Sequence, residues 1–432
     1  MSTVFVYDEG GRLLGEIEGW ILDEYLWYLD GYDSEKPLSD DTEYAVNRAS
    51  NLLKDYSNKG EGRLVLWKCD VEDDEATILE HIRIYGEKPL YTLFYQEKPN
   101  ELVIPGELDG NLVIGIGKEA FYAWSYRKYD DLERVILPAS IKVIGENAFG
   151  GRNSLRSITI PQGIEEIEDG AFDGCSGLIE ANIPAGVIRI GIGAFQGCSS
   201  LKSIAIPQGV EGIEDDAFGG CSGLIEASIP ASVKRIGIRA FRGCTGLVRI
   251  SISAGVETID EEAFADCPAL THVTIPDSVK DIGGGAFSKC TGLVSIDLPQ
   301  DIEDICSDTF ENCFSLTSIT IPDCVESISS GAFWGCSGLT NVILPANLHL
   351  IDEFAFSDCS SLADITIPEG VTTILDRAFR GCKNLESVTI PASVKTIDDG
   401  AFGNCGNLTL FVKAGSCAEQ YAKDEHREYI VE

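Results

Sequence analysis

The sequence predicts a repeat solenoid: a right-handed coil of about thirteen units of roughly 23 residues with a parallel β-sheet face, preceded by a small α+β domain. Three observations support this fold. Twelve phenylalanines from Phe149 to Phe402 recur at intervals of 23 residues, and each follows Ala except Phe310, which follows Thr309. Most units also carry the pattern L-x-x-I-x-I-P. Eleven of the 15 cysteines lie three residues after one of these phenylalanines.

One unit shows how each segment is expected to fold. The L-x-x-I-x-I segment that starts at Leu201 alternates at its end and is rich in β-branched residues, which favours a short strand. Pro207 has no backbone N–H to donate and has a fixed φ angle, so it ends the strand at a corner. The V-x-x-I segment from Val210 returns along the opposite wall, and the A-F-x-x-C segment closes the circuit. A single unit cannot bury these apolar residues, so the units must stack.

The cysteines at the repeat position, from Cys175 to Cys405, should form a row inside the stack. Neighbouring Cα atoms in stacked strands lie roughly 4.8 Å apart, a distance that disulfide geometry tolerates. However, the sequence contains no C-x-x-C or Cys/His zinc spacing, and free cysteine is among the most buried residue types. We therefore expect a reduced row in the core, with disulfide bonds or a metal as the alternatives. The odd total of 15 excludes complete internal pairing.

The pattern I-P-x-x-V-x-x-I-G-x-x-A-F-x-G-C-x-x-L resembles the BspA-type, or Treponema pallidum-type, leucine-rich repeat family over about residues 101–413. The resemblance implies a leucine-rich repeat solenoid and, from the family's surface adhesins, a role in cell adhesion through protein binding. The first residues, MSTVFVYDEGGRLLGEIEGW, show no basic start followed by an apolar stretch. The sequence as written therefore predicts a cytoplasmic location by default, or the cell surface or secretion if a leader has been removed.

The N-terminal residues 1–98 do not repeat and predict a small α+β domain of no recognised family. Residues 4–7 and 13–17 flank DEGGR and predict a hairpin. Residues 42–56 are expected to be helical and residues 64–69 to form a strand, whereas residues 78–84 fit either state.

The solenoid is expected to span residues 99–413 and to end in a cap at residues 414–432, because the last unit of an array must cover its apolar face. In the cap, Ser416 is the expected N-cap of a short helix over residues 417–425, with Tyr421 facing inward. Residues 429–431 are expected to form a closing strand.

A loop near the start of the array is longer than the repeat allows, because Phe121 and Phe149 are separated by 28 residues instead of 23. This loop contains four aromatic residues, Tyr122, Trp124, Tyr126 and Tyr129. The loop has two interpretations: it covers the joint with the N-terminal region, or it binds a partner, since aromatic residues are enriched in binding hot spots.

The formal charge of −37, from 70 acidic and 33 basic residues, predicts repulsion from nucleic acid and from anionic membrane surfaces. No uninterrupted apolar run is long enough to cross a bilayer, so membrane insertion is not expected. Acidic clusters such as those at Asp215 and Asp260 have no calcium-binding spacing and are expected to form a solvated face on the outer turn.

No catalytic or cofactor motif is apparent in the sequence. The motifs G-x-S-x-G and G-x-x-x-x-G-K-[ST] are absent, and none of the four histidines lies in a metal or hydrolase motif. The sequence therefore predicts a non-enzymatic scaffold without cofactor or metal. Two alternatives stay open: an acidic intracellular inhibitor or immunity-type protein that binds a basic partner, and an enzyme within residues 1–98.

The second, third and fifth positions of each L-x-x-I-x-I segment point outward and are free of packing. We expect this strand face to bind a protein, with the acidic flanks steering toward a basic partner, and carbohydrate is an alternative ligand. His272 is either a polar surface residue or a contact. The candidate binding residues on this face are Thr271, His272, Thr274, Asp297, Thr317, Thr340, Asn341 and Ile343.

Overall fold

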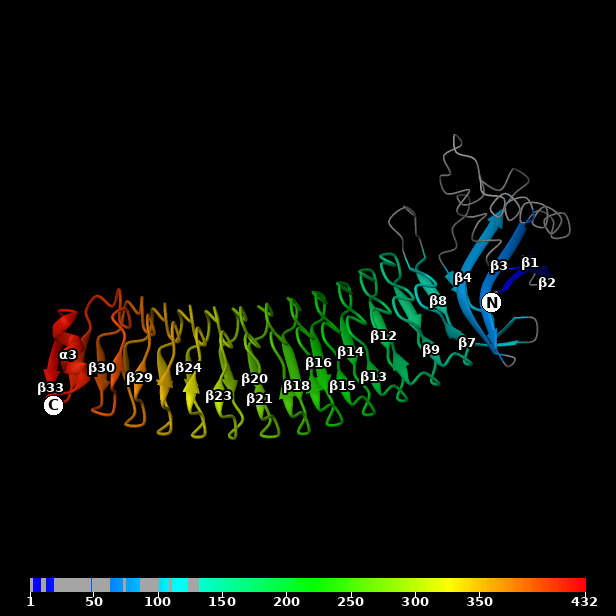
Figure 1. The fold of residues 1–432 in the computed structure, drawn as a ribbon. Helices are drawn as coiled ribbons and strands as arrows, with labels where there is room; N and C mark the ends of the chain where they lie inside the picture. The colour runs from blue at the N-terminus through cyan, green and yellow to red at the C-terminus, as the bar shows by residue number, and fades with distance from the viewer. Residues whose placement is uncertain are drawn as a thin grey trace. The chain divides into compact units, whose positions relative to one another are not determined.

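The computed structural model describes residues 3–8, 13–18, 48, 63–72, 75–85, 101–108, 111–122 and 132–432 (Figure 1). The chain divides into two compact units, Met1–Gly186 and Val187–Glu432, and we describe each by itself. The repeats form a parallel-strand β-solenoid of about 13 turns with about 23 residues per turn. The repeat solenoid predicted from the phenylalanine spacing is therefore confirmed.

The first unit begins with four antiparallel strands, β1 (Thr3–Asp8), β2 (Leu13–Glu18), β3 (Arg63–Glu72) and β4 (Glu75–Tyr85). Strand β1 pairs with β2 and with β3, and β3 pairs with β4. The predicted hairpin and the strand predicted at residues 64–69 are confirmed, and residues 78–84, which fitted either state, lie within a strand. Of the helix predicted at residues 42–56, only residue 48 is described, and it is helical.

Strand β4 also pairs in parallel with β7 (Asn111–Ile116), a strand of the first solenoid coil, and β6 (Glu107–Leu108) pairs with β7 antiparallel. The four N-terminal strands therefore extend the sheet of that coil, and they satisfy backbone N–H and C=O groups that an open sheet edge leaves unpaired. The boundary at residue 98 stays a prediction.

The remaining strands of the first unit lie in two parallel rows, one on each wall of the coil. The long-strand row contains β5 (Glu101–Val103), β8 (Arg134–Ile136), β10 (Ser157–Thr159) and β12 (Glu180–Asn182). The short-strand row continues from β7 through β9 (Val143–Ile144) and β11 (Glu166–Ile167).

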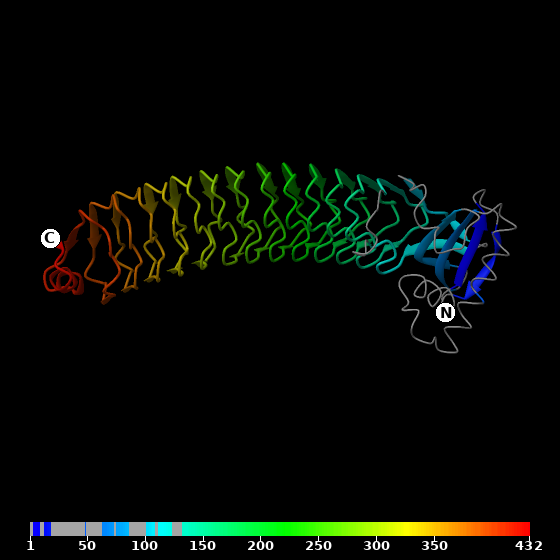
Figure 2. The same cartoon turned by 90° about the horizontal axis from the view of Figure 1, so that it is seen from above.

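The second unit repeats the same two rows, and its strands lie side by side along the unit (Figures 1 and 2). Its long-strand row consists of β14 (Ser203–Ala205), β16 (Glu226–Ile229), β18 (Arg249–Ile252), β20 (His272–Thr274), β22 (Ser295–Asp297), β24 (Ser318–Thr320), β26 (Asn341–Ile343), β28 (Asp364–Thr366), β30 (Ser387–Ile390) and β32 (Thr409–Val412). Its short-strand row consists of β13 (Arg189–Ile190), β15 (Gly212–Ile213), β17 (Arg235–Ile236), β19 (Thr258–Ile259), β21 (Asp281–Ile282), β23 (Asp304–Ile305), β25 (Ser327–Ile328), β27 (Leu350–Ile351), β29 (Thr373–Ile374) and β31 (Thr396–Ile397). Paired residues are one repeat apart, as in the pairing of Ser318 with Asn341.

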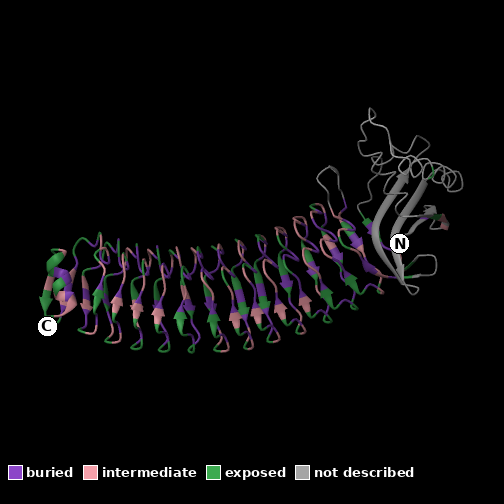
Figure 3. Ribbon diagram, in the orientation of Figure 1, coloured by how far each residue is buried: buried purple, intermediate pink, exposed green. Residues whose placement is uncertain are grey.

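The core of the second unit is a set of stacked columns of identical side chains. The phenylalanine rings from Phe195 to Phe402 stack with centroid separations of 5.1 to 5.9 Å, and all are fully buried. Buried and exposed segments alternate along each coil, because the strands turn every second side chain inward (Figure 3). Each row therefore packs against copies of itself, which makes neighbouring coils interdependent.

The cysteine row lies beside the phenylalanine column, and its members are free thiols in the structure. In the second unit, the thiols from Cys221 to Cys405 each donate to the carbonyl oxygen of the repeat phenylalanine in the preceding coil, as from Cys221 to Phe195, at 3.0 to 3.3 Å. The thiols therefore satisfy carbonyl groups at the buried corner as well as filling space.

The predicted C-terminal cap is present as helix α3 (Cys417–Asp424) followed by β33 (Glu428–Val431), which pairs in parallel with β32. The Ser416 side chain accepts a hydrogen bond from the Glu419 backbone N–H at 3.2 Å, so Ser416 is the N-cap. Tyr421 is buried and its ring meets Phe402 edge-on, with the centroids 6.0 Å apart. The helix thus covers the last ring of the phenylalanine column.

Replacing Ser416 with Ala is expected to lower the free energy of unfolding by about 1 kcal/mol, because the Glu419 N–H loses its acceptor. Urea titration followed by circular dichroism measures the change. Ser318→Ala on an exposed strand position is the control and is expected to change stability by less than about 0.5 kcal/mol. Equal stability of both variants would show that the cap hydrogen bond does not hold the end of the array.

Candidate functional site

The strand face is the outward side of the long-strand row. In strands β20, β24 and β28 the middle residue is buried and the two flanking residues are exposed, as expected from the two-residue period. All eight candidate binding residues lie on four successive coils, those that begin at Leu270, Leu293, Leu316 and Leu339. All eight are exposed. The structure therefore brings the predicted residues together on one surface.

His272 is the centre of a hydrogen-bonded chain that links two neighbouring coils. Its Nδ1 lies 2.8 Å from the Ser295 Oγ, and its Nε2 lies 3.2 Å from the Thr274 Oγ1. The Thr274 hydroxyl donates to the Asp297 carboxylate at 3.1 Å, so it must accept from the Nε2–H of His272. When the ring is neutral, its Nδ1 accepts from the Ser295 hydroxyl.

This chain resembles a Ser-His-Asp arrangement, but its surroundings differ from those of a hydrolase. The His272 and Asp297 side chains are 53% and 65% exposed, and their closest atoms are 3.6 Å apart. Because both side chains are this open to water, the chain is better suited to holding side chains in fixed orientations than to acyl transfer, which requires a water-excluding site with oxyanion donors.

The other candidate residues are fixed by the backbone of the next two coils. Thr340 donates both its backbone N–H and its hydroxyl to the carbonyl oxygen of Thr317, at 2.9 and 3.0 Å. Asn341 lies opposite Ser318, and Ile343, which is 53% exposed, lies opposite Thr320. The surface therefore combines ordered hydroxyl and amide groups with an exposed aliphatic side chain.

Of the four aromatic residues in the long loop, only Tyr122 lies in the described part of the chain. Its ring packs against Gly150, where an added Cβ would come within 2.7 Å of the ring. Gly150 belongs to the next coil of the solenoid, so this contact does not decide between the covering and the binding interpretation. Trp124, Tyr126 and Tyr129 lie outside the described residues, so the binding interpretation stays a prediction.

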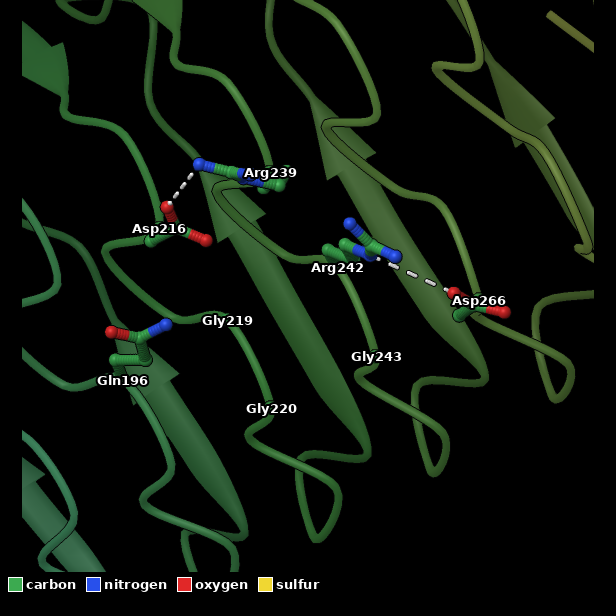
Figure 4. A pocket seen from close by; sticks show the side chains of 8 residues that line it. All are labelled: Gln196, Asp216, Gly219, Gly220, Arg239, Arg242, Gly243 and Asp266. Carbon is green, nitrogen blue, oxygen red and sulfur yellow. Dashed lines mark hydrogen bonds and ion pairs between the residues drawn. The ribbon is translucent and has the colours of Figure 1, made fainter. Parts of the chain in front are cut away.

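A polar groove of about 440 Å³ lies on the turns of the second unit, outside the strand face (Figure 4). Three glycines leave room along it, and four charged side chains and one amide line it. The Arg239 guanidinium pairs with Asp216 at 3.0 Å, and Arg242 pairs with Glu262 at 2.6 Å and with Asp266 at 3.6 Å. The lining contains no Ser, Cys or His, so the groove can hydrogen-bond a polar ligand but offers none of the usual nucleophiles.

These ion pairs correct the expectation of a uniformly solvated acidic face on the outer turn. Arg235 pairs with Glu214, Asp215 and Asp260, so one guanidinium connects the acidic clusters of the coils on either side. The cause is visible in the sequence, since a single coil carries arginines at positions 235, 239 and 242 between two acidic coils. Comparing residues at the same position of successive coils would have revealed these ion pairs between coils.

Neither a metal centre nor a membrane span emerges from the described ranges. Among these residues, no three His, Cys, Asp or Glu side chains are arranged to hold a metal ion. No helix in the same ranges has the length and apolar character needed to cross a bilayer.

The repeat itself identifies the family. The model of the BspA type leucine rich repeat region matches residues 115–245, 212–340 and 303–419. The chain belongs to the BspA-type leucine-rich repeat family. The resemblance drawn from the 23-residue pattern is thus confirmed, and the strand face described above belongs to the BspA-type repeats. No curated protein sequence matches the chain.

Two solved structures of bacterial leucine-rich repeat proteins are similar to this BspA-type chain. A protein from Bacteroides ovatus is 26% identical with a TM-score of 0.65, and the match covers 84% of this chain and 97% of that one. A leucine-rich cell surface protein from Faecalibacterium prausnitzii is 29% identical with a TM-score of 0.50, and the match covers 82% of this chain and 95% of that one. Both matches agree with the leucine-rich repeat solenoid.

Proposed function

We propose that this BspA-type protein is a non-enzymatic, adhesin-like module that holds a protein partner on its strand face. The observation that carries the proposal is that eight outward side chains lie exposed on four successive coils. These side chains take no part in core packing, and hydrogen bonds already hold those of His272, Thr274 and Thr340. A surface ordered before binding loses less conformational entropy when the partner arrives.

The charge of the chain supports a basic partner. With a formal charge of −37, the protein attracts positively charged proteins over long distances and speeds their association. The strand face itself carries few charges: among the eight candidate residues, only Asp297 is acidic. In this proposal the acidic surroundings steer the partner, and the hydroxyl, amide and aliphatic groups of the strand face provide the close contacts.

The proposal also includes a location at the cell surface. The support is the similarity to the Faecalibacterium prausnitzii protein, which is described as a leucine-rich cell surface protein. Adhesion requires an exposed binding face, and the strand face of the second unit is exposed over all four coils.

A triple variant of the strand face tests the proposal. Replacing Thr271 and Asn341 with Arg and His272 with Glu places bulky charges on the surface, and we expect the partner to lose about 2 kcal/mol or more of binding free energy, roughly 30-fold in Kd. Partners are first captured from an extract with the full chain, and the affinity of the captured protein is then measured for each variant.

The matched control is His349→Glu, because His349 is exposed on the short-strand side, next to β27. This variant should retain the partner, and both variants should unfold at nearly the same temperature as the unaltered protein. Full partner binding by the triple variant would exclude the strand face as the binding surface.

A further inference from the structure

Two aromatic side chains occupy neighbouring turns of the second unit, between β25 and β26 and between β27 and β28. Trp334 follows the core Phe333, and Phe354 comes two residues before the core Phe356 of the next coil. Their ring centroids lie 6.1 Å apart with the planes tilted by 40°. Trp334 is 42% exposed, whereas Phe354 is half-buried. This aromatic pair is separate from the strand face and from the polar groove.

Phe354 has a backbone conformation that bulky residues rarely adopt. Its φ angle is +58°, in the left-handed region. Eight other residues of the second unit hold the same turn position with a positive φ, and none is aromatic: Gly193, Asp216, Arg239, Glu262, Gly285, Asp308, Gly331 and Arg377. Glycine adopts this conformation without strain, so the fold does not call for a phenylalanine here. Such unfavourable residues are concentrated at functional sites.

The pair already holds one cation. The Arg377 guanidinium carbon lies 5.3 Å from the centre of the Phe354 ring, within the range of a cation–π interaction. In the described part of the second unit, no Lys or Arg is placed in the same way over Trp334. Trp334 is 42% exposed, so solvent reaches part of its side chain, and indole is the best of the three aromatic types for binding a cation.

Two carboxylates, one from each neighbouring coil, lie near Trp334. The Trp334 indole N–H donates to the Asp358 carboxylate at 3.4 Å. Gly331 lies between Asp308 and Trp334, since a Cβ added there would meet a carboxylate oxygen of Asp308 and, at 3.9 Å, the Cβ of Trp334. Partial burial and the nearby Glu311 carboxylate raise the pKa of Asp308, while the Lys289 ammonium acts in the opposite direction.

We propose that Trp334 and Phe354, with Asp358 and Asp308, form a second recognition site that receives a Lys or Arg side chain from a basic peptide segment. The ammonium or guanidinium group would lie against the indole ring and close to the carboxylates, while its aliphatic stem covers the apolar ring edge. The site lies on the turns and does not depend on the strand-face proposal.

Fluorescence anisotropy of a labelled lysine–glycine peptide, measured with the full chain, tests this site. Trp334→Ala and Phe354→Gly are each expected to weaken binding by roughly tenfold, and added salt should weaken the binding that remains. Phe354→Gly is the decisive variant, because glycine relieves the positive φ and should leave the unfolding temperature unchanged or higher. If Phe354→Gly binds the peptide more weakly but is at least as stable as the unaltered protein, the loss of binding is not caused by loss of folded structure.

His349→Glu, which lies in neither proposed site, is the control and should bind the lysine–glycine peptide as the unaltered protein does. Equal binding by Trp334→Ala, Phe354→Gly and the unaltered protein would overturn the proposal and attribute binding to the overall negative charge. Trp334-dependent binding of a β-linked glucose oligosaccharide without binding of the peptide would also overturn it, in favour of a sugar site.

Discussion

Raising the pH from about 9 to about 11 is expected to unfold the second unit cooperatively, because its buried thiols resist ionisation. Burial raises the pKa of Cys221, Cys290 and Cys336 to about 12. Burial also raises the pKa of four further thiols of the row well above the usual value, those of Cys244, Cys267, Cys313 and Cys359. In the unfolded chain these thiols ionise near pH 8.5.

The direction of the effect follows from which state loses protons first. Above pH 8.5 or so the unfolded chain releases thiol protons that the folded chain keeps, so the free energy of unfolding falls as the pH rises. The stabilisation is fully present below that pH and is lost progressively toward pH 12. Each thiol contributes a slope of about 1.4 kcal/mol per pH unit, so seven together reach roughly 10 kcal/mol per unit.

Circular dichroism across a pH titration in the presence of a reductant measures this transition. Cys267→Ala combined with Cys313→Ala should reduce the slope by about 3 kcal/mol per pH unit, since two of the seven thiols no longer titrate. An unchanged slope in this double variant would show that ionisation of the row does not cause the alkaline unfolding.

Replacing Phe287 with Ala is expected to destabilise the second unit by about 3 to 5 kcal/mol. The ring is fully buried and stacks on Phe264 at 5.4 Å and on Phe310 at 5.9 Å, so its removal leaves a cavity in the middle of the column. Because coils interact mainly with their neighbours, the cavity also weakens the coupling between the two halves of the unit. We expect the denaturation curve to broaden or divide into two steps.

Urea denaturation followed by circular dichroism tests this expectation. The control is Phe314→Ala, since Phe314 is 49% exposed and lies outside the column. This control should change the free energy of unfolding by less than about 0.5 kcal/mol. Equal midpoints for the two variants would contradict the assignment of the phenylalanine column as the core that couples the coils.

The fold could be predicted from the sequence because the same buried apolar positions recur in every coil. Phe287 and its equivalents recur at a fixed interval, and any other packing would leave these rings exposed. A separate rule, the preference of Ser for the N-cap of a helix, placed Ser416 at the start of the cap helix, where its side chain accepts a hydrogen bond from the Glu419 N–H. The outward positions of the strands also followed from the period of two, so all eight residues of the strand face lie where the sequence placed them.

The contacts between coils were harder to predict, because a motif describes one coil and these contacts join two. The hydrogen-bonded chain from Ser295 through His272 to Asp297 depends on the register of β20 and β22. The pairing of β4 with β7 depends on how the non-repeating strands meet the first coil. The aromatic pair was missed because Trp334 and Phe354 are 20 residues apart in the sequence and meet only when the coils stack.

Histidine-directed chemical labelling of the captured complex tests the central claim, that the strand face holds the partner, most directly. Diethyl pyrocarbonate modifies accessible imidazoles, and His272 on β20 and His349 beside β27 are both exposed in the free protein. We predict that the partner protects His272 from modification and leaves His349 as reactive as before. Equal modification of His272 with and without the partner would contradict the assignment of the strand face as the binding surface.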